Sequence, residues 1–387
     1  MKRSLLLLLF CLALVTFGCA KETGVTQKPP LAKIGFYFPA YEDYFGDLYD
    51  YEKIAAEKIQ KEFQVKVEFN KVRDTVYEYA YAEQLARNND ILVFMNFPLN
   101  YTYSELTGKY PQKYFIGIES YIDGNSYDEP ANGSGIFARD EQGAYLAGIL
   151  AAELTTESNI PGINKEKKVG FIGAVPSPWF MRDLGGYQYG IWKTDPTIKI
   201  YEVWGNIDDP QAFNRPDWAY VQAKKLYEQG VDIIFTVAGK GDDGVCKAAK
   251  EKGKYVITMN TYKGYLAPGH VLAGVNRRVD VMIYKELKDF LDQKRNIQNG
   301  TLKAVNFHAG SYKYGIPEGA IELSDLVGMD EEEAWLKTGK IAQKDFDAIK
   351  LMKSRIPLKI IQDIADAKNN VISGQVEVRE GTGPVVE

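Results

Sequence analysis

Short apolar segments alternate with amphipathic segments along most of this 387-residue chain. In the first part, strands are predicted at residues 34–38, 65–69, 91–95 and 114–118, with helical segments at 51–63 and about 80–88. Strands that alternate with helices at this interval form parallel sheets, because each helix carries the chain back across a face of the sheet. The chain is therefore predicted to have an α/β fold.

A second series of the same kind follows a stretch rich in Gly, Asn, Asp and Ser that ends near residue 135. Its predicted strands lie at 135–138, 169–173, 198–204, 232–238, 255–259 and 271–275. We therefore expect two doubly wound parallel-sheet lobes joined by a hinge. The expected lobes are 33–134 with about 261–305, and 135–260 with about 306–387. The length and the 45% hydrophobic content suffice for two such cores.

The first nineteen residues have the layout of an export signal: Lys2 and Arg3, an apolar run over 5–15, and Gly18 before Cys19. The run is too short to span a bilayer as a helix. The segment resembles a bacterial lipoprotein signal, which implies that Cys19 is acylated, and residues 20–32 would form a tether. An ordinary secretory signal cut nearby is the alternative. Both predict an extracytoplasmic protein, and the first predicts one anchored to the cell membrane.

Charge and cysteine content narrow the possible partners. The formal net charge is −5, and Lys and Arg are dispersed along the chain, which argues against nucleic acid as a partner. Of the three cysteines, Cys11 would leave with the signal and Cys19 would carry lipid. Cys246 then has no partner for an intrachain disulfide.

The segment 239–244, GKGDDG, follows an apolar strand and opens a helix, as a dinucleotide-binding GxGxxG does. However, it lies in the middle of its series, and Asn260 ends the next strand where a ribose-binding acid belongs. We therefore expect no cofactor. Backbone N–H groups at this helix start could still donate to a ligand oxygen, and a simple tight turn is the alternative.

Residues typical of catalysis are missing from the sequence pattern. His270 and His308 have no metal-binding spacing, and no GxSxG segment occurs. The adjacent acids at 208–209 and 242–243 would diverge, whereas a glycosidase needs two carboxyl groups that face one bond. We expect a protein without catalytic or metal-binding residues, with an extracytoplasmic hydrolase as the minor alternative.

Several segments jointly resemble the basic membrane protein family, the substrate-binding lipoproteins of nucleoside ABC transporters. They are 139–148 (RDEQGAYLAG), 169–173 with Ser177-Pro178 and the Gly186 to Gly190 spacing, 208–210, 230–239, 277–280 (RRVD) and 371–376, which is similar to the family's final strand. The resemblance implies a type I periplasmic-binding-protein fold, a small ligand held between the lobes, and an ABC permease as partner. The chain departs from the family in its 39–46 loop, at Asn260, where the family has a sugar-binding Asp, and at Arg277, where Lys is common.

Ligands of doubly wound sheets bind beyond the carboxyl ends of strands, so the loops after the predicted strands supply the candidates. Aromatic residues make up 13% of the chain, many of them in such loops, which favours a flat or ring-bearing ligand. The candidate ligand-binding residues are Tyr41, Asp43, Phe45, Asn96, Phe97, Trp179, Phe180, Arg182, Gly239, Lys240, Asp242, Asn260, Tyr262 and Arg277. The expected function is capture of a nucleoside or related solute for import. A sugar or other polar solute, or a sensory protein that presents its ligand to a receptor, remain alternatives.

Overall fold

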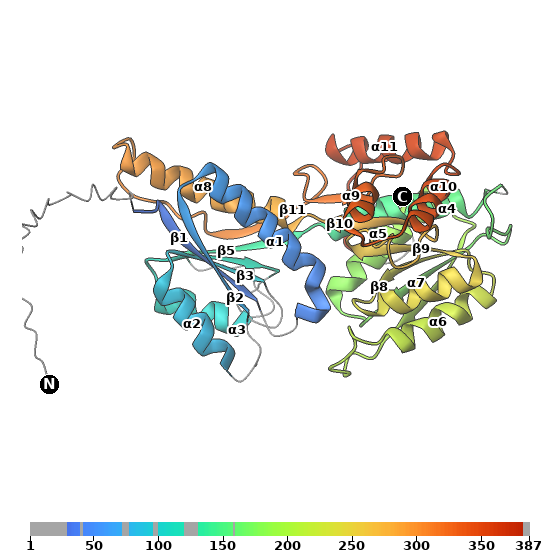
Figure 1. Ribbon diagram of the computed structural model, residues 1–387, viewed down its shortest axis with the longest axis horizontal. Helices are drawn as coiled ribbons and strands as arrows, with labels where there is room; N and C mark the ends of the chain where they lie inside the picture. The colour runs from blue at the N-terminus through green and yellow to red at the C-terminus, as the bar shows by residue number, and fades with distance from the viewer. Residues whose placement is uncertain are drawn as a thin grey trace, which may run out of the picture.

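The computed structural model describes residues 29–38, 42–71, 77–95, 100–119, 131–157 and 159–381. Cys19, the predicted signal and most of the predicted tether lie outside these residues. The described residues form two lobes side by side (Figure 1). Among them, no helix is both long and apolar enough to cross a membrane.

The first lobe, called the N-lobe here, is built around a six-stranded sheet in the order β11-β5-β4-β3-β1-β2 within the described residues. Every pairing in this sheet is parallel. Its strands are β1 (Ala32–Phe38), β2 (Val65–Lys71), β3 (Ile91–Met95), β4 (Tyr114–Ile118), β5 (Gly133–Ala138) and β11 (Gly310–Tyr314). Its helices are α1 (Glu42–Glu62), α2 (Glu78–Asn88), α3 (Asn100–Lys109) and α8 (Val279–Gln298).

The second lobe, the C-lobe, has the sheet order β12-β10-β9-β8-β6-β7 in the described part of the chain, and only the β10–β12 pair is antiparallel. Its strands are β6 (Lys168–Gly173), β7 (Lys199–Trp204), β8 (Ile233–Val237), β9 (Tyr255–Asn260), β10 (Val271–Arg277) and β12 (Ile321–Leu323). Its helices are α4 (Asp140–Leu154), α5 (Pro178–Thr194), α6 (Pro216–Glu228), α7 (Gly241–Lys252), α9 (Asp330–Thr338), α10 (Gln343–Lys353) and α11 (Leu358–Ile372).

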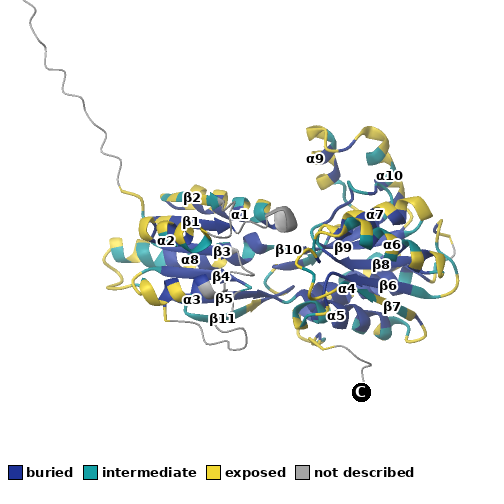
Figure 2. Ribbon diagram, turned by 90° about the horizontal axis from the view of Figure 1, so that it is seen from below, coloured by how far each residue is buried: buried dark blue, intermediate teal, exposed yellow. Residues whose placement is uncertain are grey.

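Strand periodicity explains why helices cover both faces of each sheet. In β1, Phe36 and Phe38 belong to the core beneath α1 and α8, whereas Tyr37 belongs to the opposite core beneath α2 and α3. In the C-lobe, Phe171 packs in the core shared with α4 and α5, and Ile172 packs with α6 and α7. Strands buried on both faces appear as dark blue arrows in the middle of each lobe (Figure 2). The predicted α/β fold with two doubly wound lobes is confirmed.

The chain passes between the lobes at residues other than those we expected. Residues 135–138, expected to open the second lobe, belong to β5 and pair with β4 and β11 in the N-lobe sheet. Strand β10, expected in the first lobe, pairs with β9 in the C-lobe. The strands on either side of the polar stretch before residue 135, β4 and β5, pair with each other, so this change of composition does not mark a change of lobe. Turn-forming residues occur before a strand whether it joins the same sheet or another.

The segment 371–376 is not a strand. Val371 and Ile372 end α11, and Gly374 then adopts a left-handed φ of 73°. The Val376 N–H donates to the Asn370 carbonyl oxygen at an N–O distance of 3.0 Å. Such a hydrogen bond is typical of the turn that ends a helix. The alternating apolar residues of this segment therefore belong to the last turn of an amphipathic helix and to the turn that ends it.

Candidate functional site

The two sheets present the carboxyl ends of their strands to each other. Within the described residues, the chain crosses between the lobes at 138–140, 277–279 and 314–321, which together we call the junction. Strands β5, β11 and β10 each enter it at their carboxyl ends, and their parallel neighbours end at the same edges. A ligand beyond the carboxyl ends of either sheet would therefore lie between the lobes.

Backbone hydrogen bonds tie the crossings together. The Arg139 N–H donates to the Tyr314 carbonyl, and the Arg278 N–H donates to the Ala320 carbonyl, both at 2.8 Å. The Gln142 side chain adds a third link, because its Oε1 accepts the Ile316 N–H at 2.7 Å. Hydrogen bonds thus join the three crossings to one another.

A buried ion pair reinforces the junction. Arg277 ends β10, and its Nε donates to Oδ1 of Asp140, the first residue of α4, at 3.0 Å, while a second guanidinium nitrogen contacts Oδ2. Burial acts to lower the pKa of Arg277, but the Asp140 and Glu119 carboxylates outweigh it, so its pKa is raised. The guanidinium therefore stays charged and fixes α4 to β10, and this is the position the structure gives to the candidate Arg277.

Arg278 lies in the second crossing, at residues 277–279, and its side chain makes several contacts there. Its guanidinium donates to both Asp280 carboxylate oxygens at 2.9 and 2.8 Å, and it reaches Glu322 of β12 at 3.3 Å. It also lies 5.6 Å from the centre of the Tyr51 ring on α1. One side chain thus contacts elements of both lobes.

Arg182 and Glu119 face each other from opposite lobes. Arg182 lies near the start of α5 in the C-lobe, and Glu119 directly follows β4 in the N-lobe. Arg182 Nη2 lies 3.9 Å from Glu119 Oε2, and Glu119 Oε1 accepts the Ala138 N–H at 2.8 Å. Burial raises the pKa of the Glu119 carboxyl, against the opposing effect of Arg277 and Arg182. The pair places a donor and an acceptor where the two lobes meet.

Aromatic side chains gather on the C-lobe side of the same space. Trp179, in the first turn of α5, stacks at 6.4 Å on Phe137 of the N-lobe strand β5, and the Arg182 guanidinium lies 4.9 Å from its ring centre. Phe180 packs at 5.3 Å on Phe213, which precedes α6. The structure thus brings together the candidates Trp179, Phe180 and Arg182.

The glycine-rich turn after β8 is shaped by close packing. Gly239 has a φ of 61°, and a Cβ there would lie 2.8 Å from the Phe213 carbonyl oxygen. Lys240 follows as the residue before α7, with its backbone N–H donated to that same carbonyl at 2.8 Å. The helix begins at Gly241, within the glycine-rich segment 239–244. The turn therefore lies against the Phe180–Phe213 pair.

Asp242 faces the interior of the C-lobe and is only 1% exposed. Its carboxylate accepts hydrogen bonds from the Thr236 hydroxyl at 2.8 Å, the Ala238 N–H at 3.2 Å and the Lys263 ammonium at 2.7 Å. Burial raises the pKa of Asp242, and Lys263 opposes that rise. The candidate Asp242 thus forms a buried ion pair with Lys263, which joins α7 to the loop after β9.

Two further candidates lie at the end of β9 and just after it, and they have different surroundings. Asn260 has a φ of 71°, a left-handed conformation that Asn tolerates better than most residues, and it is partly exposed at the carboxyl edge of the sheet. Tyr262 is 3% exposed and stacks on Trp335 of α9 at 5.5 Å. Asn260 stays available at the interlobe edge, whereas Tyr262 belongs to the C-lobe core.

The N-lobe candidates are placed only in part. Tyr41, Asn96 and Phe97 lie outside the described residues, and Asp43 and Phe45 fall in the first turn of α1. Glu119, Asp140 and Phe213 were not among the candidates. Glu119 directly follows the predicted strand 114–118, so the rule that selects loops after strands would have included it.

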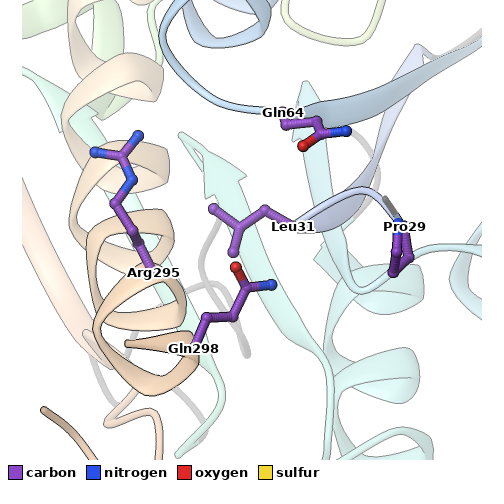
Figure 3. A pocket seen from close by; sticks show the side chains of 5 residues that line it. All are labelled: Pro29, Leu31, Gln64, Arg295 and Gln298. Atoms are coloured by element: carbon purple, nitrogen blue, oxygen red, sulfur yellow. The ribbon is translucent and has the colours of Figure 1, made fainter. Parts of the chain in front are cut away.

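Two cavities lie away from the interlobe space. One, of about 390 Å³, is lined by Pro29, Leu31, Gln64, Arg295 and Gln298 at the amino ends of the N-lobe strands (Figure 3). The other, of about 450 Å³, lies behind the first crossing between Arg139, Tyr189 and residues 377–380. Among the residues that the structure describes, no three His, Cys, Asp or Glu side chains lie close enough to hold a metal ion.

Comparison with known proteins places the chain in a family. The family model of PnrA-like ABC transporter substrate-binding proteins matches residues 50–362. Basic membrane protein B of Borreliella afzelii is 32% identical over 50% of this chain and 53% of its own length, and basic membrane protein D of Borreliella burgdorferi is 32% identical over 46% and 49%. These alignments span about half of each relative, whereas basic membrane protein C of Borreliella burgdorferi is 23% identical over 95% of this chain and 94% of its own.

Solved structures share the fold. A solute-binding protein of an ABC transporter system from Aeropyrum pernix has a TM-score of 0.68 at 19% identity, with 89% of this chain and 92% of that chain covered. One from Conexibacter woesei has a TM-score of 0.61 at 15% identity, with 90% and 98% covered. At these identities the likeness concerns the fold alone.

Proposed function

Because this chain belongs to the PnrA-like family of ABC transporter substrate-binding proteins, we propose that it captures a nucleoside or related ring-bearing solute between its lobes and delivers it to an ABC permease. The observation that carries the proposal is the convergence of aromatic and charged side chains on the interlobe space. Trp179, Phe180 and Phe213 offer faces on which a planar ring can stack, and Arg182 with Glu119 offers polar contacts from both lobes.

Further residues support the same site. Asn260, partly exposed at the C-lobe edge, has an amide that can hydrogen-bond a sugar hydroxyl. We assign the N-lobe contacts to the candidates Tyr41, Asn96 and Phe97, which come after β1 and β3 in the sequence. Binding would favour a closed state, because only then do both lobes contact the ligand.

The test is a ligand panel on protein that lacks residues 1–19. Nucleosides, free bases and pentoses are added in turn, and the melting temperature is followed. A ligand at 100 times its Kd stabilises the folded protein by about 2.7 kcal/mol, which shifts the melting temperature by several degrees. Shifts with pentoses but not with nucleosides would favour a sugar-binding protein, and no shift with any solute would contradict the proposal.

We also propose that the protein is exported and anchored by lipid on Cys19, since the first nineteen residues resemble a lipoprotein signal. The full-length protein should partition into the detergent phase of Triton X-114, and the Cys19→Ser variant should move to the aqueous phase. Cys246→Ser is the matched control, because Cys246 is fully buried in the C-lobe. Equal partitioning of the wild type and Cys19→Ser would refute acylation at this residue.

A further inference from the structure

The last described segment of the chain, residues 375–381, lies against the first crossing. It follows α11, which packs on α4 in the C-lobe, and it begins after the left-handed turn at Gly374. Val378 is 2% exposed and belongs to the hydrophobic core, and its carbonyl oxygen accepts a hydrogen bond from Arg139 Nη2 at 3.5 Å. The segment is therefore held both by the C-lobe and by the crossing that contains Arg139.

An ion pair connects the same segment to the N-lobe. Glu380 Oε1 lies 2.6 Å from Nζ of Lys313, and Lys313 belongs to β11, the strand at the edge of the N-lobe sheet. Burial acts to raise the pKa of Glu380, but Lys313 outweighs it and Arg182 and Arg139 add to the effect of Lys313, so the pKa is lowered. Glu380 therefore stays ionised at neutral pH and can pair with Lys313.

The link to the N-lobe can break without opening the core of either lobe. The side chains of Lys313 and Glu380 are 38% and 39% exposed, and exposed ion pairs are weak and screened by salt. A cavity of about 450 Å³ separates the segment from part of the crossing. Because the segment is anchored on the C-lobe, rotation of the N-lobe would move Lys313 relative to Glu380. The ion pair therefore forms at some angles between the lobes and is lost at others.

We propose that residues 375–381 form a strap that joins the C-lobe to the N-lobe through the Lys313–Glu380 ion pair and restrains rotation of the lobes about the junction. The strap is a noncovalent connection in addition to the three crossings. A contact that forms only at certain interlobe angles favours those angles by its own interaction free energy. An exposed ion pair can change their population up to about fivefold. This inference goes beyond the proposed capture of a solute and does not depend on it.

Double electron–electron resonance between spin labels on the two lobes tests the strap. The labels are attached at Gln84→Cys on α2 and Lys344→Cys on α10, both exposed, in protein that lacks residues 1–19. The cysteine that then remains, Cys246, is buried. Lys313→Met and Glu380→Gln should each broaden the distance distribution, and the double variant should be no broader than either, because both changes remove the same pair. Unchanged distributions in both folded single variants would overturn the proposal.

The matched control removes an ion pair of similar exposure that lies within one lobe. Lys252→Met breaks the 2.8 Å contact with Glu228 in the C-lobe and should keep the wild-type distribution. Raising the NaCl concentration from about 0.05 to about 0.5 M should broaden the wild-type distribution and leave that of Glu380→Gln unchanged. Melting temperatures are measured first, and the salt response of the wild type tests the strap even if a variant fails to fold. Equal broadening in Lys252→Met, or no salt response in the wild type, would contradict the strap.

Discussion

Glu52 is a carboxyl group whose position costs the fold stability. It lies on α1 with its side chain fully buried, and neither of its oxygens has a hydrogen-bond partner in the part of the chain that the structure describes. Burial raises the pKa of Glu52 well above its ordinary value. A carboxyl group in such a site is more stable protonated, because an unpaired buried charge is strongly disfavoured.

This position predicts a pH dependence of unfolding. The folded-state pKa exceeds the unfolded one, so the folded protein holds the proton more tightly. The contribution to stability is then complete below the unfolded pKa, near 4.3, and is lost as the pH rises through the folded pKa. Between the two values the loss is about 1.4 kcal/mol per pH unit. Glu52→Gln should remove this slope and be more stable than the wild type at pH 8.

Urea unfolding at pH 5, 6, 7 and 8 checks the prediction. Glu57→Gln, an exposed substitution on the same helix, is the matched control and should follow the wild type at every pH. If Glu52→Gln were less stable than the wild type throughout and kept its slope, the carboxylate would have to be ionised and paired.

At the scale of elements, the segment 139–148 joins α4 to the neighbouring helix, strand and crossing. Asp140 pairs with Arg277, Gln142 binds the third crossing, and Gly148 lies where a Cβ would be 2.2 Å from the Tyr187 carbonyl oxygen of α5. Reciprocally, a Cβ on Gly190 of α5 would lie 2.2 Å from the Tyr145 carbonyl oxygen of α4. The two helices thus pack backbone against backbone, which only glycine allows.

Gly190→Ala should therefore destabilise the C-lobe. The added methyl group meets backbone rather than a flexible side chain, so the helices must separate, at a cost of about 1–3 kcal/mol or more. Gly108→Ala is the matched control: it is also helical, in α3, and nothing lies within 4 Å of its added Cβ. The control should be unchanged or up to about 1 kcal/mol more stable, because Ala favours helices. Equal stabilities in thermal unfolding would contradict the close packing of α4 and α5.

Elements of this fold could be predicted well, and their assignment to lobes could not. The apolar run that forms β8 and the glycine at 253 that ends α7 are local signals, which any strand and helix of this kind carries. The contacts that fix the crossings join residues far apart in the sequence. Arg277 and Asp140 are 137 residues apart, and a short stretch of sequence reveals neither their pairing nor that of Asp242 with Lys263. The candidates Trp179, Phe180 and Arg182 came from the rule on strand ends; they lie together at the start of α5, and their role in ligand binding stays a prediction.

At the scale of the whole molecule, the short crossings determine which motions are open to the lobes. Backbone bonds hold the crossings to one another, and the Arg277–Asp140 pair fixes α4 to the C-lobe sheet. Internal rearrangement of either lobe would break these contacts, whereas rotation of one lobe about the junction need not. Figure 1 shows the lobes meeting chiefly at this junction.

Ligand binding should therefore close the molecule as two rigid bodies. Small-angle X-ray scattering on protein without residues 1–19 should show a smaller radius of gyration when it is saturated with a solute that the thermal-shift panel identifies. Far-UV circular dichroism should stay the same, because each lobe keeps its helices and strands. The Arg182→Met variant, saturated with the same solute, should contract less, since closure then lacks a contact between the lobes. An unchanged radius of gyration in calorimetrically saturated wild-type protein would mean that the lobes are already closed or that the ligand contacts only one of them, and either result contradicts closure about the junction.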